Sequence, residues 1–168
     1  RNGSTSAVLC LLGQTVAERR ASLATLGEQR QAMLDVEEFV AVAPRLEICE
    51  AAVSAIDRDE GITEGGDAEL RVALRRKNLG KHEVAGPAHA PHFPGASVQD
   101  AWWMILRASG STEPLACRRV TDRGSDVAEK LQFEVPSAGR CKLKLLVLSE
   151  AYAGLDVERE VAFVARSA

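Results

Sequence analysis

A chain of 168 residues is long enough for one domain with a small appendage, and its formal charge of −3 and pI near 5.7 lack the strongly basic balance typical of nucleic-acid-binding domains. Its apolar runs are far too short for a membrane span, and it begins at Arg1 without a basic-then-apolar signal segment. We therefore expect a soluble piece of a longer protein.

The chain has four cysteines that lie far apart, and none is in a C-x-x-C pair, which argues against a zinc ribbon or a redox motif. An even number permits disulfides, but sparse cysteines within apolar runs are more typical of reduced core residues in an intracellular protein. We expect free, buried thiols at Cys10, Cys49, Cys117 and Cys141.

Residues 1–44 have the apolar spacing of helices. Apolar side chains recur at helical intervals within residues 16–26 and again within residues 33–40, which predicts two short amphipathic helices. Residues 7–12 fit either a short helix or a buried strand. So small a helical segment has too little core to stand alone, so it must pack on the following domain or on a preceding part of the protein.

Two local signals bound the first of these helices. Thr15 can cap its start, and Glu18 stands three residues later, which is the capping-box spacing. Gly27 is placed where a helix would stop.

Residues 45–168 change to a period of two. Seven segments alternate in this way: 46–48, 70–74, 102–106, 115–119, 131–135, 141–147 and 161–165. Turn signals such as Gly65-Gly66 separate them. The prediction is a mainly β chain, a seven-stranded antiparallel sandwich of immunoglobulin or fibronectin type III kind after a small helical segment. The Pro-rich connector 86–94 is predicted to be a crossover strap between the sheets.

Two predicted strands are apolar on both faces. Alternation puts Trp103 and Ile105 opposite the face that carries Trp102, and it puts Leu146 and Leu148 on the corresponding side of the sixth strand. A free-standing sandwich normally solvates its outer faces, so we expect the helical segment or a partner to cover one of them. The candidate partner-docking residues are Trp103, Ile105, Leu146, Leu148 and Tyr152, although packing on the sandwich edge is the favoured alternative for Tyr152.

No catalytic or metal-binding constellation stands out in the sequence. His89 and His92 lie in the strap with no carboxylate or thiol beside them, so surface histidines are favoured over metal ligands. No cysteine has an identifiable histidine partner, and no phosphate-binding loop sequence is present. The acidic run 57–60 fits a solvated hairpin end better than a metal cluster. We expect binding rather than catalysis, and no cofactor or metal in this chain.

Two basic clusters are candidates for phosphate contact. One contains Arg75 and Arg76, and the other contains Arg118, Arg119 and Arg123. Arginine offers bidentate geometry for phosphate, so local RNA contact is one hypothesis. Nearby Asp and Glu dilute both clusters, so solubilising charge is the favoured alternative.

Several blocks of the second half resemble, in order and spacing, the Sec sixty-three homology domain. They are Glu83–Pro87, Ala90–Pro94, Trp102-Trp103, Leu115–Val120, Lys130–Pro136 and Leu148–Asp156. The resemblance to the end of that domain's helical part, through Glu18-Arg19-Arg20, Leu23 and Leu46-Glu47-Ile48, is weaker. The domain occurs in large superfamily-two RNA helicases of the spliceosome or of the activating signal cointegrator complex. It also occurs in a subunit of the endoplasmic-reticulum protein translocation machinery.

Arg118-Arg119-Val120 resembles the basic-basic-aliphatic strand end of the helicase branch, so a spliceosomal-type helicase is favoured over the membrane-associated translocation subunit. Glu150, Ala151 and Val157 depart from the residues usual in the family and indicate a divergent lineage. The resemblance implies a nuclear parent protein that uses ATP and magnesium to unwind RNA. It implies that this chain is a non-catalytic module that braces the region behind the motor and binds proteins of a ribonucleoprotein complex.

Overall fold

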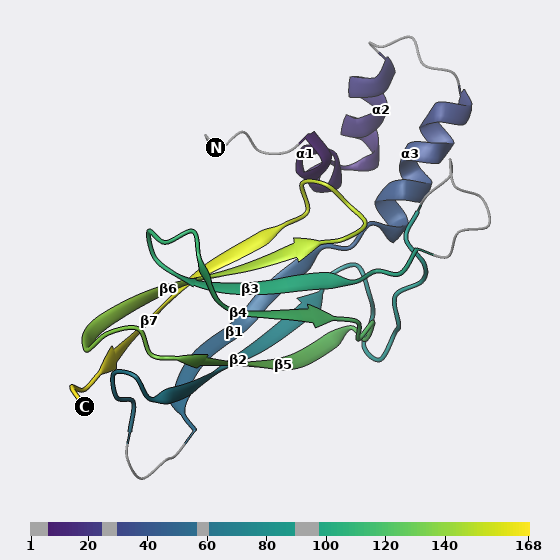
Figure 1. The fold of residues 1–168 in the computed structure, drawn as a ribbon. Coiled ribbons are helices and arrows are strands. Elements are labelled where there is room, and N and C mark those ends of the chain that lie inside the picture. The colour runs from purple at the N-terminus through teal and green to yellow at the C-terminus, as the bar shows by residue number, and fades with distance from the viewer. Residues whose placement is uncertain (1–6, 25–29, 57–60, 90–97) are drawn as a thin grey trace.

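The computed structural model describes residues 7–24, 30–56, 61–89 and 98–168. Within them, three short helices precede seven strands (Figure 1). The elements are α1 Ala7–Gly13, α2 Val16–Ala24, α3 Arg30–Val42, β1 Leu46–Ala55, β2 Asp67–Arg76, β3 Trp102–Ala108, β4 Pro114–Val120, β5 Asp126–Glu134, β6 Gly139–Ser149 and β7 Val157–Ala165. The helix stop predicted at Gly27, the acidic run 57–60 and His92 lie outside the described residues.

The seven strands form two antiparallel sheets, which confirms the predicted sandwich. One sheet has three strands in the order β1-β2-β5, and the other has four in the order β4-β3-β6-β7. Six of the seven predicted segments lie entirely within these strands, and the segment 131–135 extends one residue beyond β5. Since β2 and β3 belong to different sheets, the connection between them crosses from one sheet to the other, as predicted for the strap. Residues 90–97 of that strap are not among the described residues.

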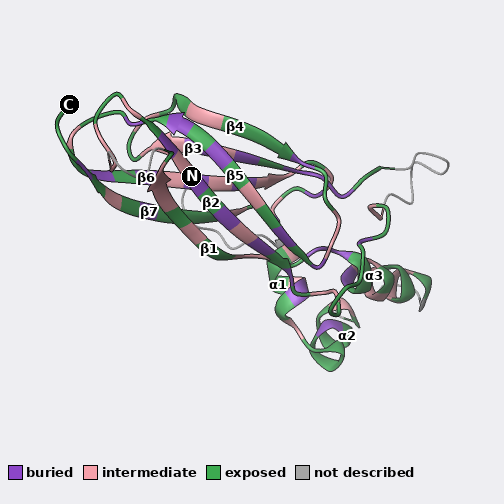
Figure 2. Cartoon of the chain, turned by 90° about the horizontal axis from the view of Figure 1, so that it is seen from below, coloured by how far each residue is buried: buried purple, intermediate pink, exposed green. Residues whose placement is uncertain are grey.

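The core lies between the two sheets and follows the period-two pattern (Figure 2). Leu70, Val72 and Leu74 of β2 are buried, and β3 contributes Trp102 and Met104, which have no exposed surface. Burying an apolar side chain of this size stabilises the fold by about 1.5–3 kcal/mol. The alternation seen in the sequence therefore marks the inner faces correctly.

The capping box predicted before α2 is present. The Thr15 backbone N–H donates to Glu18 Oε2 at 2.7 Å, and the Glu18 N–H donates to Thr15 Oγ1 at 3.3 Å. The N–H hydrogen bond from Thr15 is the main reason that the pKa of Glu18 lies below its ordinary value of 4.5. The segment 7–12, for which the sequence permitted helix or strand, is a helix.

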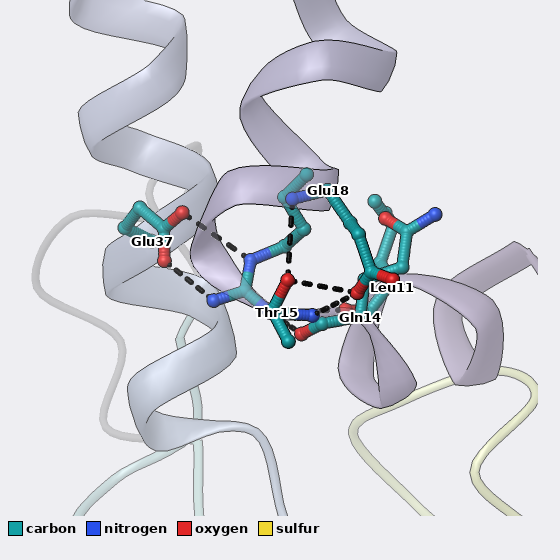
Figure 3. Close-up of polar contacts among 6 residues, drawn as sticks. Leu11, Gln14, Thr15, Glu18 and Glu37 are labelled. Atoms are coloured by element: carbon teal, nitrogen blue, oxygen red, sulfur yellow. Dashed lines mark hydrogen bonds and ion pairs between the residues drawn. The ribbon is translucent and has the colours of Figure 1, made fainter.

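Arg19 of α2 contacts both of the other helices, through partners that Figure 3 labels as Leu11, Gln14 and Glu37. Its guanidinium pairs with Glu37 of α3, with Nη2 2.8 Å from Oε2, and Nη1 donates to the Leu11 and Gln14 carbonyls at the end of α1. Carbonyls at a helix C-terminus lack intrahelical partners, and a cation there is favourable. Arg19 is 5% exposed, so its buried charge is satisfied by the end of α1 and by α3.

The helices stand at one end of the sandwich and do not cover either outer face, as Figures 1 and 2 show. The prediction that the helical segment covers an outer face is therefore wrong, and a partner is the alternative that stays open. The helices reach the sandwich through α3, where Phe39 packs edge-on against Tyr152 with ring centroids 5.9 Å apart. Val40 and Ala43 are buried at the same junction.

Each open edge of the sandwich carries an arginine that spans the gap between the sheets. At the β4–β5 edge, Arg118 Nε lies 2.8 Å from Glu129 Oε2. At the β7–β1 edge, Arg159 Nη1 donates to the Ile48 carbonyl at 2.8 Å. Charged residues that point inward on edge strands are a common protection against strand pairing with another chain.

Candidate protein-docking face

The outward side of the four-stranded sheet carries a cluster of apolar side chains, here named the β3–β6 face: Trp103, Ile105, Cys117, Leu146 and Leu148. Residues directly opposite in an antiparallel pair share a face of the sheet. Trp103 is opposite Leu148, and Ile105 is opposite both Leu146 and Cys117. Four of the five predicted docking residues therefore lie together.

No described element of the chain covers the β3–β6 face. Trp103 is 39% exposed, Cys117 is exposed, and Ile105, Leu146 and Leu148 are half-buried by their neighbours. β3 and β6 are the central strands of the sheet, so this cluster occupies its middle rather than a rim. A contiguous apolar patch in that position is typical of an interaction site.

Paired charges border the β3–β6 face. Arg119, opposite Trp103 on β4, makes a bidentate pair with Glu150, with Nε–Oε1 at 2.6 Å and Nη2–Oε2 at 2.8 Å. The Arg119 hydrogen bond holds the pKa of Glu150 below its ordinary value, and a hydrogen bond from the Trp103 side chain adds to this effect. On the other side, Lys144 pairs with Glu158 of β7 at 2.7 Å. An apolar centre within a polar rim is the usual anatomy of a protein interface.

The outer face of the three-stranded sheet has the opposite character. Glu69, on the central strand β2, pairs with Arg71 at 2.8 Å and with Lys130 at 3.1 Å. These hydrogen bonds, first that of Arg71 and then that of Lys130, lower the pKa of Glu69. This outer face is solvated, so the two sheets of the sandwich differ in what their outer faces can bind.

Tyr152, the fifth predicted docking residue, does not belong to the β3–β6 face. It is 8% exposed beneath α3, and its hydroxyl oxygen accepts a hydrogen bond from the His89 backbone N–H at 2.7 Å. Burial raises the pKa of Tyr152. Tyr152 therefore packs on the sandwich, the alternative favoured from the sequence, and is not part of the exposed apolar cluster.

The candidate phosphate-contact arginines are not gathered on one surface. Arg76 is 1% exposed, and its Nε lies 2.8 Å from Asp100 Oδ2, so its prediction as a phosphate contact was wrong. Arg75 pairs with Asp126 at 2.7 Å, while Arg118 and Arg119 pair with Glu129 and Glu150 as described above. Arg123 is half-buried. The clusters seen in the sequence are thus divided among separate ion pairs.

All four cysteines are free, as predicted, but only Cys141 is in the core. Cys10 is exposed on α1, and Cys49 falls where the β1–β2 register shifts by one residue, which leaves it without a partner across the ladder. Cys117 is the member of the β3–β6 face that sequence reasoning missed, because it was interpreted as a core residue. Its position directly opposite Ile105 is visible only once the register is known.

Over the described parts of the chain, no group of three or more His, Cys, Asp or Glu side chains has the arrangement of a metal site. Among the described residues, no helix combines the length and the apolar character needed to cross a membrane.

The chain was compared with known proteins. No family model matches it. It is 32% identical over 132 residues to the U5 small nuclear ribonucleoprotein 200 kDa helicase of Caenorhabditis elegans, which covers 78% of this chain and 6% of the relative. The human protein of the same name is 30% identical over 141 residues, or 84% of this chain and 6% of the relative. The chain is homologous to one segment of these spliceosomal helicases.

The relationship extends to fungi. The pre-mRNA-splicing factor brr2 of Schizosaccharomyces pombe is 31% identical over 105 residues, which is 62% of this chain and 5% of that protein. The predicted resemblance to a spliceosomal-type helicase is thereby confirmed, and the translocation-subunit alternative gains no support. These U5 helicase relatives are many times longer than the chain, and the comparisons do not name the Sec sixty-three homology domain, so that assignment stays a prediction.

Proposed function

We propose that this chain is a non-catalytic, protein-binding module of a spliceosomal-type RNA helicase and that it docks partners through the β3–β6 face. The observation that carries the proposal is the uncovered cluster around Trp103 on one outer face, beside a polar outer face on the other sheet. Tryptophan is enriched among the residues that dominate the energy of protein interfaces. The names of the relatives support a ribonucleoprotein setting, namely the U5 particle of the nucleus.

A bracing role towards the rest of the parent protein is the second part of the proposal. The helical segment exposes large apolar side chains on all three helices: Leu9, Val16, Leu34 and Val42. Exposed apolar surface on such small helices favours burial against further protein. Arg19 ties the three helices together, so they can act as one contact element.

The catalytic work is proposed to reside elsewhere in the parent protein. The relatives are named as helicases, and helicase activity requires ATP and magnesium. The sequence of this chain contains no phosphate-binding loop. We propose that the parent protein unwinds RNA in the nucleus while this module positions it within a larger assembly.

Binding of the chain to purified U5 particles tests the docking proposal. Trp103→Ala and Leu148→Ala should each weaken binding, and the tryptophan variant should do so by about 30-fold or more, as expected for a dominant interface residue. Ile56→Ala is a matched control, because Ile56 is 46% exposed and lies at the end of β1, away from this face. Bound particles should also protect Cys117 from maleimide labelling. Binding that is unchanged in Trp103→Ala and leaves Cys117 reactive would refute docking through this face.

A further inference from the structure

A cavity of about 530 Å³ lies where α3 and the strap meet the end of the sandwich. Its size is within the range of about 300–1,000 Å³ usual for ligand sites. We name it the junction cavity, and its wall includes Glu38, Val42, Leu79, Pro87, Asp100 and Tyr152. It shares no residue with the β3–β6 face.

Asp100 gives the junction cavity a buried acceptor. The residue is 3% exposed, and only one of its carboxylate oxygens is paired: Oδ2 accepts from Arg76 Nε at 2.8 Å. Oδ1 is buried and has no hydrogen-bond partner among the described residues. A buried acceptor left without a donor is costly, so a donor group that reaches Asp100 from the cavity would be favoured.

The charges around the junction cavity favour a cation over an anion. Glu38 is exposed at the wall and adds a second carboxylate, whereas no Lys or Arg is among the described residues that line the cavity. The guanidinium of Arg76 is already committed to Asp100 and to the carbonyls of Gly124 and Asp122. A phosphate would therefore meet carboxylates without a free cation to receive it.

The remaining wall is suited to an alkyl chain. Val42, Leu79 and Pro87 are apolar, and Ala41 and Ala85 add small side chains. Long basic side chains bury their methylene stems along such surfaces and present the charged group at the tip. The methylene stem of a basic side chain therefore suits the apolar part of the wall, and its charged tip suits the carboxylate.

We propose that the junction cavity receives an arginine or lysine side chain of a partner polypeptide, whose donor group pairs with Asp100 and whose charge is further balanced by Glu38. The site is independent of the β3–β6 face, so either proposal can fail while the other stands.

The test is a titration of the ¹⁵N-labelled chain with the peptide N-acetyl-Gly-Arg-Gly-amide at low salt. Its control peptide has citrulline, the neutral isostere of arginine. The arginine peptide should shift the amide signals of Ala85, Gly86 and Ala88. The citrulline peptide should bind at least about tenfold more weakly, as expected when a charged hydrogen bond to a carboxylate is replaced by a neutral one. A lysine peptide should behave like the arginine peptide.

Three variants separate the cavity from general acidity. Glu38→Gln should weaken the arginine peptide severalfold, and Ala41→Trp should abolish its binding by filling the cavity wall. Glu113→Gln removes the same charge from an exposed residue in the β3–β4 loop and should change nothing. The proposal is overturned if the two peptides bind equally, if the Glu113 and Glu38 variants weaken binding alike, or if neither peptide shifts the three amides.

Discussion

Arg118 and Arg119 are neighbours in sequence, yet their guanidinium groups lie on opposite sides of β4. Arg118 is opposite the buried Met104 and spans the sandwich edge to Glu129, whereas Arg119 is opposite Trp103 on the outer face and pairs with Glu150. Alternation along a strand forces this separation. A basic pair in the sequence therefore becomes two unrelated contacts in the fold.

We expect no salt-dependent RNA binding by this chain, because the candidate arginines Arg75, Arg118 and Arg119 are each paired with a carboxylate. A labelled single-stranded RNA should show the same low anisotropy at about 50 and about 200 mM salt, a range over which binding through many phosphate contacts falls steeply. Arg118→Ala combined with Arg119→Ala should change nothing. Binding that is strong at low salt and lost in this double variant would restore the RNA hypothesis.

Arg76→Ala should destabilise the chain by roughly 3–5 kcal/mol, the usual cost of leaving a buried charge without its partner. The variant leaves the buried Asp100 carboxylate without its ion-pair partner and removes the hydrogen bonds to the Gly124 and Asp122 carbonyls. Arg75→Ala is the matched control, since Arg75 is the adjacent residue on β2 and its side chain is 57% exposed. Urea unfolding should show a large loss of stability for the first variant and a small one for the second. Equal losses would contradict the burial of Arg76.

The two tryptophans should report different environments. In Trp103→Phe, the remaining Trp102 is fully buried, so its fluorescence should be blue-shifted and resistant to acrylamide. In Trp102→Phe, the remaining Trp103 is 39% exposed and should emit at longer wavelength and be quenched readily. Circular dichroism should show that both variants are folded. Similar quenching in the two folded variants would contradict the finding that Trp102 points into the core and Trp103 points outward.

Thiol labelling should separate three reactive cysteines from one protected cysteine. Cys10, Cys49 and Cys117 are exposed and should react with a maleimide in the native chain. Cys141 is 5% exposed, and its Sγ donates to the Ser137 carbonyl at 3.1 Å, so it should react only after denaturant is added. Mass spectrometry of the labelled peptides locates each site. Equal rates for Cys117 and Cys141 would be the contrary result.

The capping box should make helix content depend on pH. The folded state lowers the pKa of Glu18 below 4.5, so its contribution is present at neutral pH and is lost as the pH falls through the lowered value. Glu18→Ala should have less helix than the native chain at pH 7, and the difference should shrink towards pH 3. Far-UV circular dichroism measures this.

Glu18→Gln is the control for that experiment, because its amide oxygen can still accept from the Thr15 N–H without carrying charge. Its helix content should change less with pH than that of the native chain. A gap between native chain and Glu18→Ala that stays constant down to pH 3 would show that the carboxylate charge does not matter.

Much of the fold could be predicted because its signals are local. Alternation of large apolar residues identified all seven strands, and the spacing of Thr15 and Glu18 identified a helix start. The apolar outward residues Trp103, Ile105, Leu146 and Leu148 were also evident, since both faces of β3 and β6 are apolar.

The errors concern contacts that join distant segments. Arg76 continues the inward alternation of Leu70, Val72 and Leu74, but its partner Asp100 is 24 residues away and no local pattern reveals the pairing. Tyr152 is buried because α3 returns over the end of the sandwich and brings Phe39 against it. Cys117 joins the β3–β6 face through the β3–β4 register alone. These relationships depend on tertiary packing, which the sequence pattern of one strand does not contain.

The arginines at the two sandwich edges have a consequence for solubility. Arg118 and Arg159 occupy the borders along which another chain would add a strand, and each turns a charged group towards the gap between the sheets. Open-ended polymerisation through strand addition is therefore disfavoured at both borders. The chain can therefore expose the apolar β3–β6 face to a specific partner while its sheet edges resist aggregation with other copies of the chain.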